Sequence, residues 1–183
     1  AGKQTRGLFL TRKVKAMQLI FAERAFAVAP VRGSDLATFV LDLESNKVNT
    51  SSQAELIRFA LARASKSRLD NERLSLLPGG PRQDQLPDMD LLTRKCESVS
   101  AKVLPCSELH VRDIVAQNAF KYPFESPEGT PTGSAMWILA SFMNRSDSPT
   151  CVARFIGPMA FVFAGQALET NFEITINGRH SIY

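Results

Sequence analysis

The chain has 183 residues and a formal net charge of +4; 44% of its residues are hydrophobic and 22% are charged. This composition is typical of a globular protein with one buried core. No run approaches the roughly 18 apolar residues of a membrane span, and the basic residues form no continuous stripe with interleaved aromatics. We therefore expect neither a membrane nor a nucleic-acid partner.

The three cysteines, Cys96, Cys106 and Cys151, cannot all pair with one another, and none belongs to a CxxC motif. With only two histidines in the chain, no metal site is indicated. The N-terminal residues lack the apolar segment of a secretory signal. We expect buried or free thiols in a reducing compartment, and an intracellular protein of the cytoplasm or nucleus.

Residues 5–31 predict short β-strands. Gly7–Leu10 and Leu19–Glu23 are apolar runs on either side of a basic turn. A third run, Ala25–Ala29, ends at Pro30, which suits the end of a strand because proline lacks the amide that a sheet needs.

The middle of the chain predicts helices. Ser52 and Glu55 have the spacing of a capping box, and apolar residues follow at helical intervals. Residues 77–87 are rich in proline and glycine and predict a loop. A second helix is expected over Met89–Val103, and Ser107 is placed to cap a third.

The last part of the chain returns to short strands, with a Gly157–Pro158 turn that favours a hairpin. Its apolar runs are Met136–Leu139, Cys151–Ile156, Met159–Ala164 and Glu173–Ile176. The two β-rich zones are too short to bury separate cores. We therefore expect one α+β domain over residues 1–183, in which short strands and small sheets are interrupted by a helical insertion at about 34–118.

Three blocks of sequence follow a known order and spacing. Thr5–Ile20 is similar in sequence to a segment that begins Gly-Arg-Gly-Leu-Phe-Ala-Thr-Arg. Leu139–Thr150 is similar to the motif Asn-His-Ser-Cys-x-Pro-Asn and the apolar residues that precede it. Phe163–Ile176 is similar in sequence to the strand segment that follows this motif, and Asn118–Phe120 is similar to an Asn-x-Phe element. Together they resemble the SET domain of protein-lysine methyltransferases, in the fungal and animal MYND-type group whose β-fold is split by a helical insertion.

The resemblance implies a SET-like fold and a pocket for S-adenosylmethionine. It places Arg6 and Gly7 in the segment whose backbone approaches the cofactor, and Asn144 at a cofactor-contacting position. Several positions depart from the family pattern. Thr5 and Met17 stand where the family has glycines, and Arg145 stands where it has histidine. Asp147 stands in place of cysteine, Thr150 in place of asparagine, and Gly178 in place of the catalytic tyrosine.

These departures make ordinary lysine methylation hard to reconcile with the sequence, and they suggest other catalytic residues. Arg145 and Asp147 lie in the altered loop, where an arginine could bind a carboxylate or enolate. A surface pair between them is the alternative, worth about 0–1 kcal/mol. Tyr183 could supply a phenol if the chain folds back, with fraying of a near-terminal residue as the alternative.

Three aromatic residues are candidates for binding a substrate. By analogy with the family, Tyr122 and Phe124 border the pocket, and Trp137 either lines it or belongs to the core. The sequence therefore favours a SET-derived protein that binds a small organic molecule without a cofactor and promotes its cyclisation or isomerisation by positioning, as in biosynthesis. A weakened S-adenosylmethionine-dependent protein or peptide methyltransferase is the first alternative, and a non-catalytic protein-binding module is the second.

Overall fold

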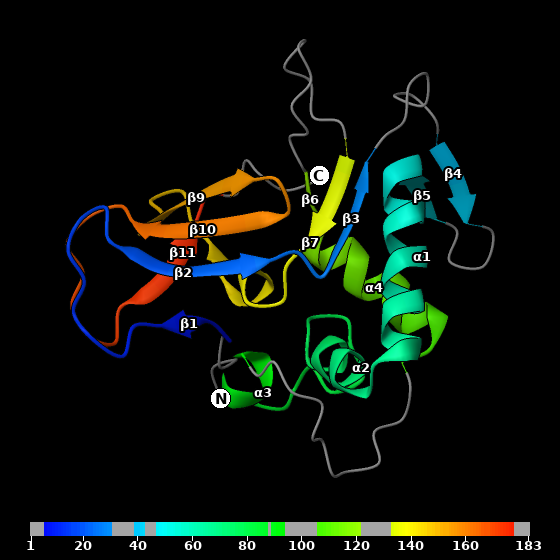
Figure 1. Ribbon diagram of the computed structural model, residues 1–183, viewed down its shortest axis with the longest axis horizontal. Coiled ribbons are helices and arrows are strands. Elements are labelled where there is room, and N and C mark those ends of the chain that lie inside the picture. Colours follow the sequence, from blue (N-terminus) through cyan, green and yellow to red (C-terminus); the bar gives the residue numbers. More distant parts are fainter. Residues whose placement is uncertain are drawn as a thin grey trace.

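The computed structural model describes residues 6–30, 39–42, 47–87, 89–93, 106–121 and 133–177. In these ranges, short strands from both ends of the chain form small sheets, and helices from the middle of the chain pack beside them (Figure 1). The predicted α+β class is confirmed.

One sheet joins three segments that are far apart in the sequence. Its order is β1 (Leu8–Phe9), β11 (Glu173–Ile176) and β8 (Asn144–Arg145). β1 is antiparallel to β11, and β8 is parallel to it. Residues of the opening block (Thr5–Ile20), the altered loop (Asn144–Thr150) and the closing strand (Glu173–Ile176) therefore meet in this sheet.

A second sheet contains the predicted hairpin. Its order is β2 (Leu19–Arg24), β10 (Met159–Ala164) and β9 (Cys151–Ile156). Gly157 has a φ of 51° in the turn between β9 and β10, a conformation that glycine adopts without steric cost. Along β10, buried residues alternate with partly buried ones, as expected for a strand with one face on the core.

The third sheet packs against the helices (Figure 1). Its order is β3 (Ala27–Pro30), β7 (Gly133–Met136) and β6 (Phe120–Lys121). The predicted strand at residues 136–139 is wrong beyond Met136. The chain turns there into the short 3-10 helix η2 (Ala140–Phe142), and the Glu23 carboxylate accepts hydrogen bonds from the Leu139 and Ala140 amides.

The expected helical insertion begins with a β-hairpin, so it is not helical throughout. The hairpin consists of β4 (Phe39–Asp42) and β5 (Lys47–Thr50). The helices described after it are α1 (Ser51–Lys66), α2 (Arg68–Ser75), α3 (Met89–Thr93) and α4 (Glu108–Asn118). Residues 94–103 of the second predicted helix lie outside the described residues.

The first helix is capped by a different pair from the one predicted. Thr50 is the N-cap, and its amide donates a hydrogen bond to Gln53 Oε1 at 3.0 Å. Ser52 lies inside the helix, where its hydroxyl meets that of Ser134 at 2.8 Å, and Glu55 forms an ion pair with Arg58. The prediction of Ser107 as the cap of α4 is confirmed.

Two clusters of buried residues form the core. One lies among α1, α2, α4 and the β3–β7 pair, and the other lies around the β2–β10–β9 sheet and β11. Cys106 and Cys151 are buried free thiols, and burial raises the pKa of Cys106 to about 11. Among the described helices, none has the length and apolar character that crossing a membrane requires.

Candidate functional site

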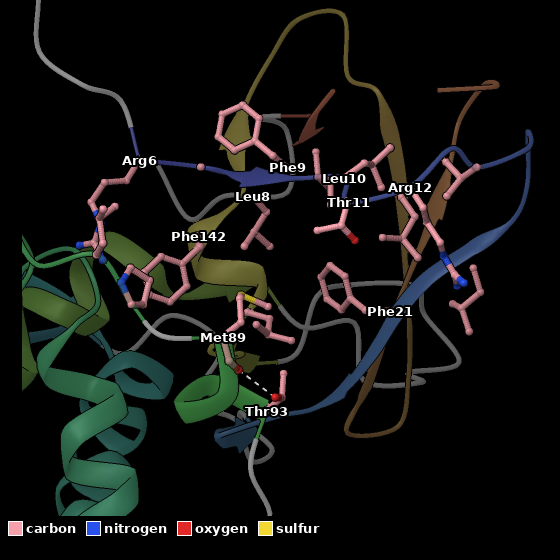
Figure 2. A pocket seen from close by; sticks show the side chains of 18 residues that line it. Arg6, Leu8, Phe9, Leu10, Thr11, Arg12, Phe21, Met89, Thr93 and Phe142 are labelled. Atoms are coloured by element: carbon pink, nitrogen blue, oxygen red, sulfur yellow. Dashed lines mark hydrogen bonds between the residues drawn. The ribbon is translucent and has the colours of Figure 1, made fainter. Parts of the chain in front are cut away.

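An apolar pocket of about 580 Å³ lies between β1, the beginning of β2, α3 and η2. Leu8, Phe21, Met89 and Phe142 surround a common space in Figure 2. Ile174 from β11 also lines the pocket. Residues of the opening block therefore form a wall of the cavity.

The opening block is held in place along one edge by backbone hydrogen bonds. The Leu10 amide donates to the Phe172 carbonyl at 2.9 Å, and the Asn171 amide donates to the Leu10 carbonyl at 2.8 Å. Val14 and Leu168 exchange two further bonds of 3.0 Å each. Since successive side chains of an extended segment point in opposite directions, anchoring the backbone in this way also fixes which side chains face the pocket.

Beside the pocket, Arg6, Gly7, Asn144 and Glu173 form a tight contact that we call the polar junction. The Asn144 Nδ2 group donates to the Arg6 carbonyl at 2.8 Å and to Glu173 Oε1 at 2.5 Å. A Cβ atom at Gly7 would lie only 2.6 Å from Glu173 Oε1. A side chain at position 7 would therefore have to displace the Glu173 carboxylate, the end of a flexible side chain, from its present contact.

The structure brings together the three predicted cofactor-binding residues, but their roles differ. Gly7 and Arg6 line the pocket, whereas Asn144 is not among its lining residues. Two hydrogen bonds from Nδ2 use the donor capacity of the Asn144 amide. In this arrangement Asn144 joins β8 to the opening block rather than facing the cavity.

Arg6 connects the opening block to the turns that follow α2. Its Nη1 donates to the Leu76 carbonyl at 3.0 Å and also bonds the Gln83 carbonyl, and its Nη2 donates to the Gln85 carbonyl at 2.9 Å. The guanidinium lies 5.1 Å from the centre of the Phe142 ring. Desolvation lowers the pKa of Arg6. These contacts hold residues 76–85 against the wall of the pocket.

Thr150 connects the altered loop to β11 through hydrogen bonds. Its hydroxyl donates to the Glu173 carbonyl at 2.8 Å and accepts from the Thr175 amide at 2.9 Å. The Thr150 amide donates to the Thr175 hydroxyl at 3.0 Å. Thr150 therefore has a structural role in this fold.

The predicted catalytic pair in the altered loop does not lie at the pocket. Arg145 and Asp147 are both exposed, and neither is among the residues that line the cavity. No ion pair joins these two side chains, both of which the structure describes. The third predicted catalytic residue, Tyr183, lies outside the described residues.

Of the predicted substrate-binding residues, Tyr122 and Phe124 also lie outside the described residues. Trp137 is described and is fully buried in the core. Its ring packs 4.7 Å from Phe155 and 5.7 Å, edge to face, from Phe120, and its Nε1 donates to the Pro158 carbonyl. The structure therefore places Trp137 in the core and not on the pocket wall, which agrees with the alternative weighed for it.

Glu23 is a residue near the site that the sequence reasoning missed. Its two carboxylate oxygens accept hydrogen bonds from the Leu139 amide at 2.9 Å and the Ala140 amide at 3.2 Å. Burial raises the pKa of Glu23 to about 7, against the opposing effects of these amides and the Arg73 charge. Because Leu139 lines the pocket, the hydrogen bond from its amide to Glu23 helps to fix the backbone of this part of the pocket wall. A single acidic residue in the apolar run Leu19–Glu23 was the available signal.

The described part of the chain holds no group of three His, Cys, Asp or Glu side chains arranged to bind a metal ion. Comparison with known proteins gives the chain no family: no protein-family model and no curated protein matches it.

Proposed function

We propose that this chain is a SET-like domain with replaced methyltransferase positions, and that its apolar pocket binds a small organic molecule. The SET-like architecture is supported by the meeting of the three resembling blocks in the β1–β11–β8 sheet. The contact between Gly7 and Asn144, which belong to two of these blocks, supports it further.

The pocket is the observation that carries the ligand-binding function. Its volume of about 580 Å³ is within the range of small-molecule sites, roughly 300–1,000 Å³, and such sites are mostly apolar. None of the lining residues in the described ranges is Asp, Glu, His, Cys, Lys or Tyr. This lining suits a reaction in which bonds rearrange within one molecule and the protein transfers no proton. A cyclisation or isomerisation accelerated by orientation is such a reaction.

Separate observations favour the two alternatives. The position of Arg6 and Gly7 on the pocket wall favours an S-adenosylmethionine-dependent methyltransferase, although the amide of Asn144 is already used within the protein. Exposed apolar side chains at the pocket favour a protein-binding module, because such groups often mark an interface. Phe9 is 53% exposed and Met89 is 51% exposed.

Binding of the neutral dye Nile red tests the proposed function. We expect a saturable increase in fluorescence with the wild-type protein, and an affinity about tenfold lower for Phe21→Ala, because truncation removes apolar contact with the ligand. Phe161→Ala is the matched control. Phe161 is partly buried like Phe21 and lies on the neighbouring strand β10, but it does not line the pocket.

Calorimetric titration with S-adenosylmethionine separates the alternatives. Micromolar binding, together with methyl incorporation into peptides or histones, would establish the methyltransferase instead. Saturable dye binding that is equally weakened in both phenylalanine variants would place the ligand elsewhere and contradict the proposed site. Absence of binding by both ligands would leave the protein-binding module.

A further inference from the structure

The charged side chains in the described lining of the pocket are positive, while the Glu173 carboxylate of the polar junction beside it is held by Asn144. Among the lining residues that the structure describes, two are arginines, Arg6 and Arg12, and none is Asp or Glu. The two arginines lie at opposite ends of the view in Figure 2, with the apolar side chains between them. Such a cavity disfavours a cationic ligand and attracts an anionic one.

The two arginines differ in their availability to a ligand. Arg6 is used within the protein, because three backbone carbonyls accept from its Nη atoms and its guanidinium lies over the Phe142 ring. Arg12 is exposed and makes no hydrogen bond or ion pair with the other residues of the described ranges. Nearby, Lys13 already forms an ion pair with Glu169 at 2.6 Å.

Thr11, the residue before Arg12 in the chain, carries a hydroxyl group. The pocket is also lined by Thr11, whose hydroxyl likewise has no partner among the described residues, whereas the Thr93 hydroxyl donates to the Met89 carbonyl at 2.8 Å (Figure 2). The fork of a guanidinium can by itself donate to both oxygens of a carboxylate. The end of the pocket at Arg12 therefore has unused donors, while the rest of its wall is mostly apolar.

We propose that the ligand of this pocket is an anionic amphiphile: its apolar body occupies the cavity beside Leu8 and Phe21, and its carboxylate pairs with Arg12. This inference rests on the proposed function, since it names the chemical class that the same pocket would take. The carboxylate serves binding and orientation: it fixes which end of the molecule enters the cavity, which is what a reaction promoted by positioning requires.

Displacement of Nile red by three ligands with the same alkyl chain tests the inference. These are decanoate, decanol and decylammonium, used below their micellar concentrations. We expect decanoate to bind about fivefold more tightly than decanol, near the upper limit for an exposed pair, and decylammonium to bind more weakly than either. The advantage of decanoate over decanol should disappear in Arg12→Gln and decrease as salt is added.

Arg24→Gln is the matched control, because Arg24 is exposed on β2 but does not line the pocket, so the advantage of decanoate should persist in it. Equal binding of decanoate and decanol by the wild-type protein, or an advantage that survives Arg12→Gln, would overturn the anionic class while leaving the apolar pocket intact. If the dye and decanol both fail to bind, the proposed function itself fails.

Discussion

The polar junction and the apolar pocket share Arg6 and Gly7, yet they differ in how many of their hydrogen-bonding groups already have partners within the protein. In the junction, the Asn144 amide donates to both the Glu173 carboxylate and the Arg6 carbonyl. The pocket beside it is open and mostly apolar, with unused donors at Arg12 and Thr11. The resemblance directs attention to the junction, whereas the space for a ligand is bounded mainly by ordinary apolar residues.

Replacing Trp137 is expected to have the largest effect on stability, because the ring belongs to the packed core and not to the pocket. Trp137→Ala should lower the free energy of unfolding by about 3–5 kcal/mol, measured by chemical denaturation. Phe172→Ala, at a residue that is 48% exposed, should change it by less than about 1 kcal/mol. A stable Trp137→Ala protein that has lost dye binding would instead place Trp137 at the site.

The pH dependence of stability tests the raised pKa of Glu23, whose carboxylate accepts hydrogen bonds from the Leu139 and Ala140 amides. Its pKa is about 7 in the folded protein against an ordinary value of 4.5, so the folded state retains a proton that the unfolded chain releases. The free energy of unfolding should therefore fall as the pH rises from about 4.5 to about 7, by about 2–3 kcal/mol.

Glu23→Gln should remove this component of the pH dependence, because the amide does not ionise. Denaturation curves at a series of pH values would measure the difference between the two proteins. Glu169→Gln, at an exposed ion pair, should retain the slope of the wild-type protein. If Glu23→Gln keeps that slope as well, a different group is responsible.

Substitution of Asn144 tests whether the junction serves folding. Asn144→Ala leaves the Arg6 carbonyl and the Glu173 carboxylate without their shared donor, and it should cost about 1–3 kcal/mol of unfolding free energy. If Asn144 served only a bound cofactor, its removal would lower S-adenosylmethionine affinity and leave the stability of the free protein unchanged. Thermal denaturation without ligand distinguishes these outcomes.

The smallest effect is expected at Arg145, the next residue along β8. Its side chain is exposed and does not line the pocket, so Arg145→Ala should change the free energy of unfolding by no more than about 0.5 kcal/mol. Dye affinity should stay within about twofold of the wild-type value. A tenfold loss of affinity in a folded Arg145→Ala protein would extend the site from the pocket to the altered loop.

Much of the local structure could be predicted from the sequence because the signals are local. The apolar runs on either side of Gly157–Pro158 form the expected hairpin, and Ser107 caps α4 as expected. The N-cap of α1 was misplaced because Thr50–Gln53 and Ser52–Glu55 both fit the capping pattern, and tertiary contact decided between them. The Ser52 hydroxyl instead forms a hydrogen bond with that of Ser134, 82 residues away in the chain.

The site was less predictable, because a cavity depends on which surfaces meet. The sequence by itself determined the α+β class and most strands around the pocket, whereas a cofactor-binding role for Arg6, Gly7 and Asn144 stays a prediction. Only the tertiary structure decided that Asn144 is bound within the junction, that Trp137 lies in the core and that Arg12 lines the pocket with Leu8 and Phe21. Strand periodicity assigns a side chain to one face, but the segment opposite that face is chosen by contacts more than a hundred residues apart in the chain.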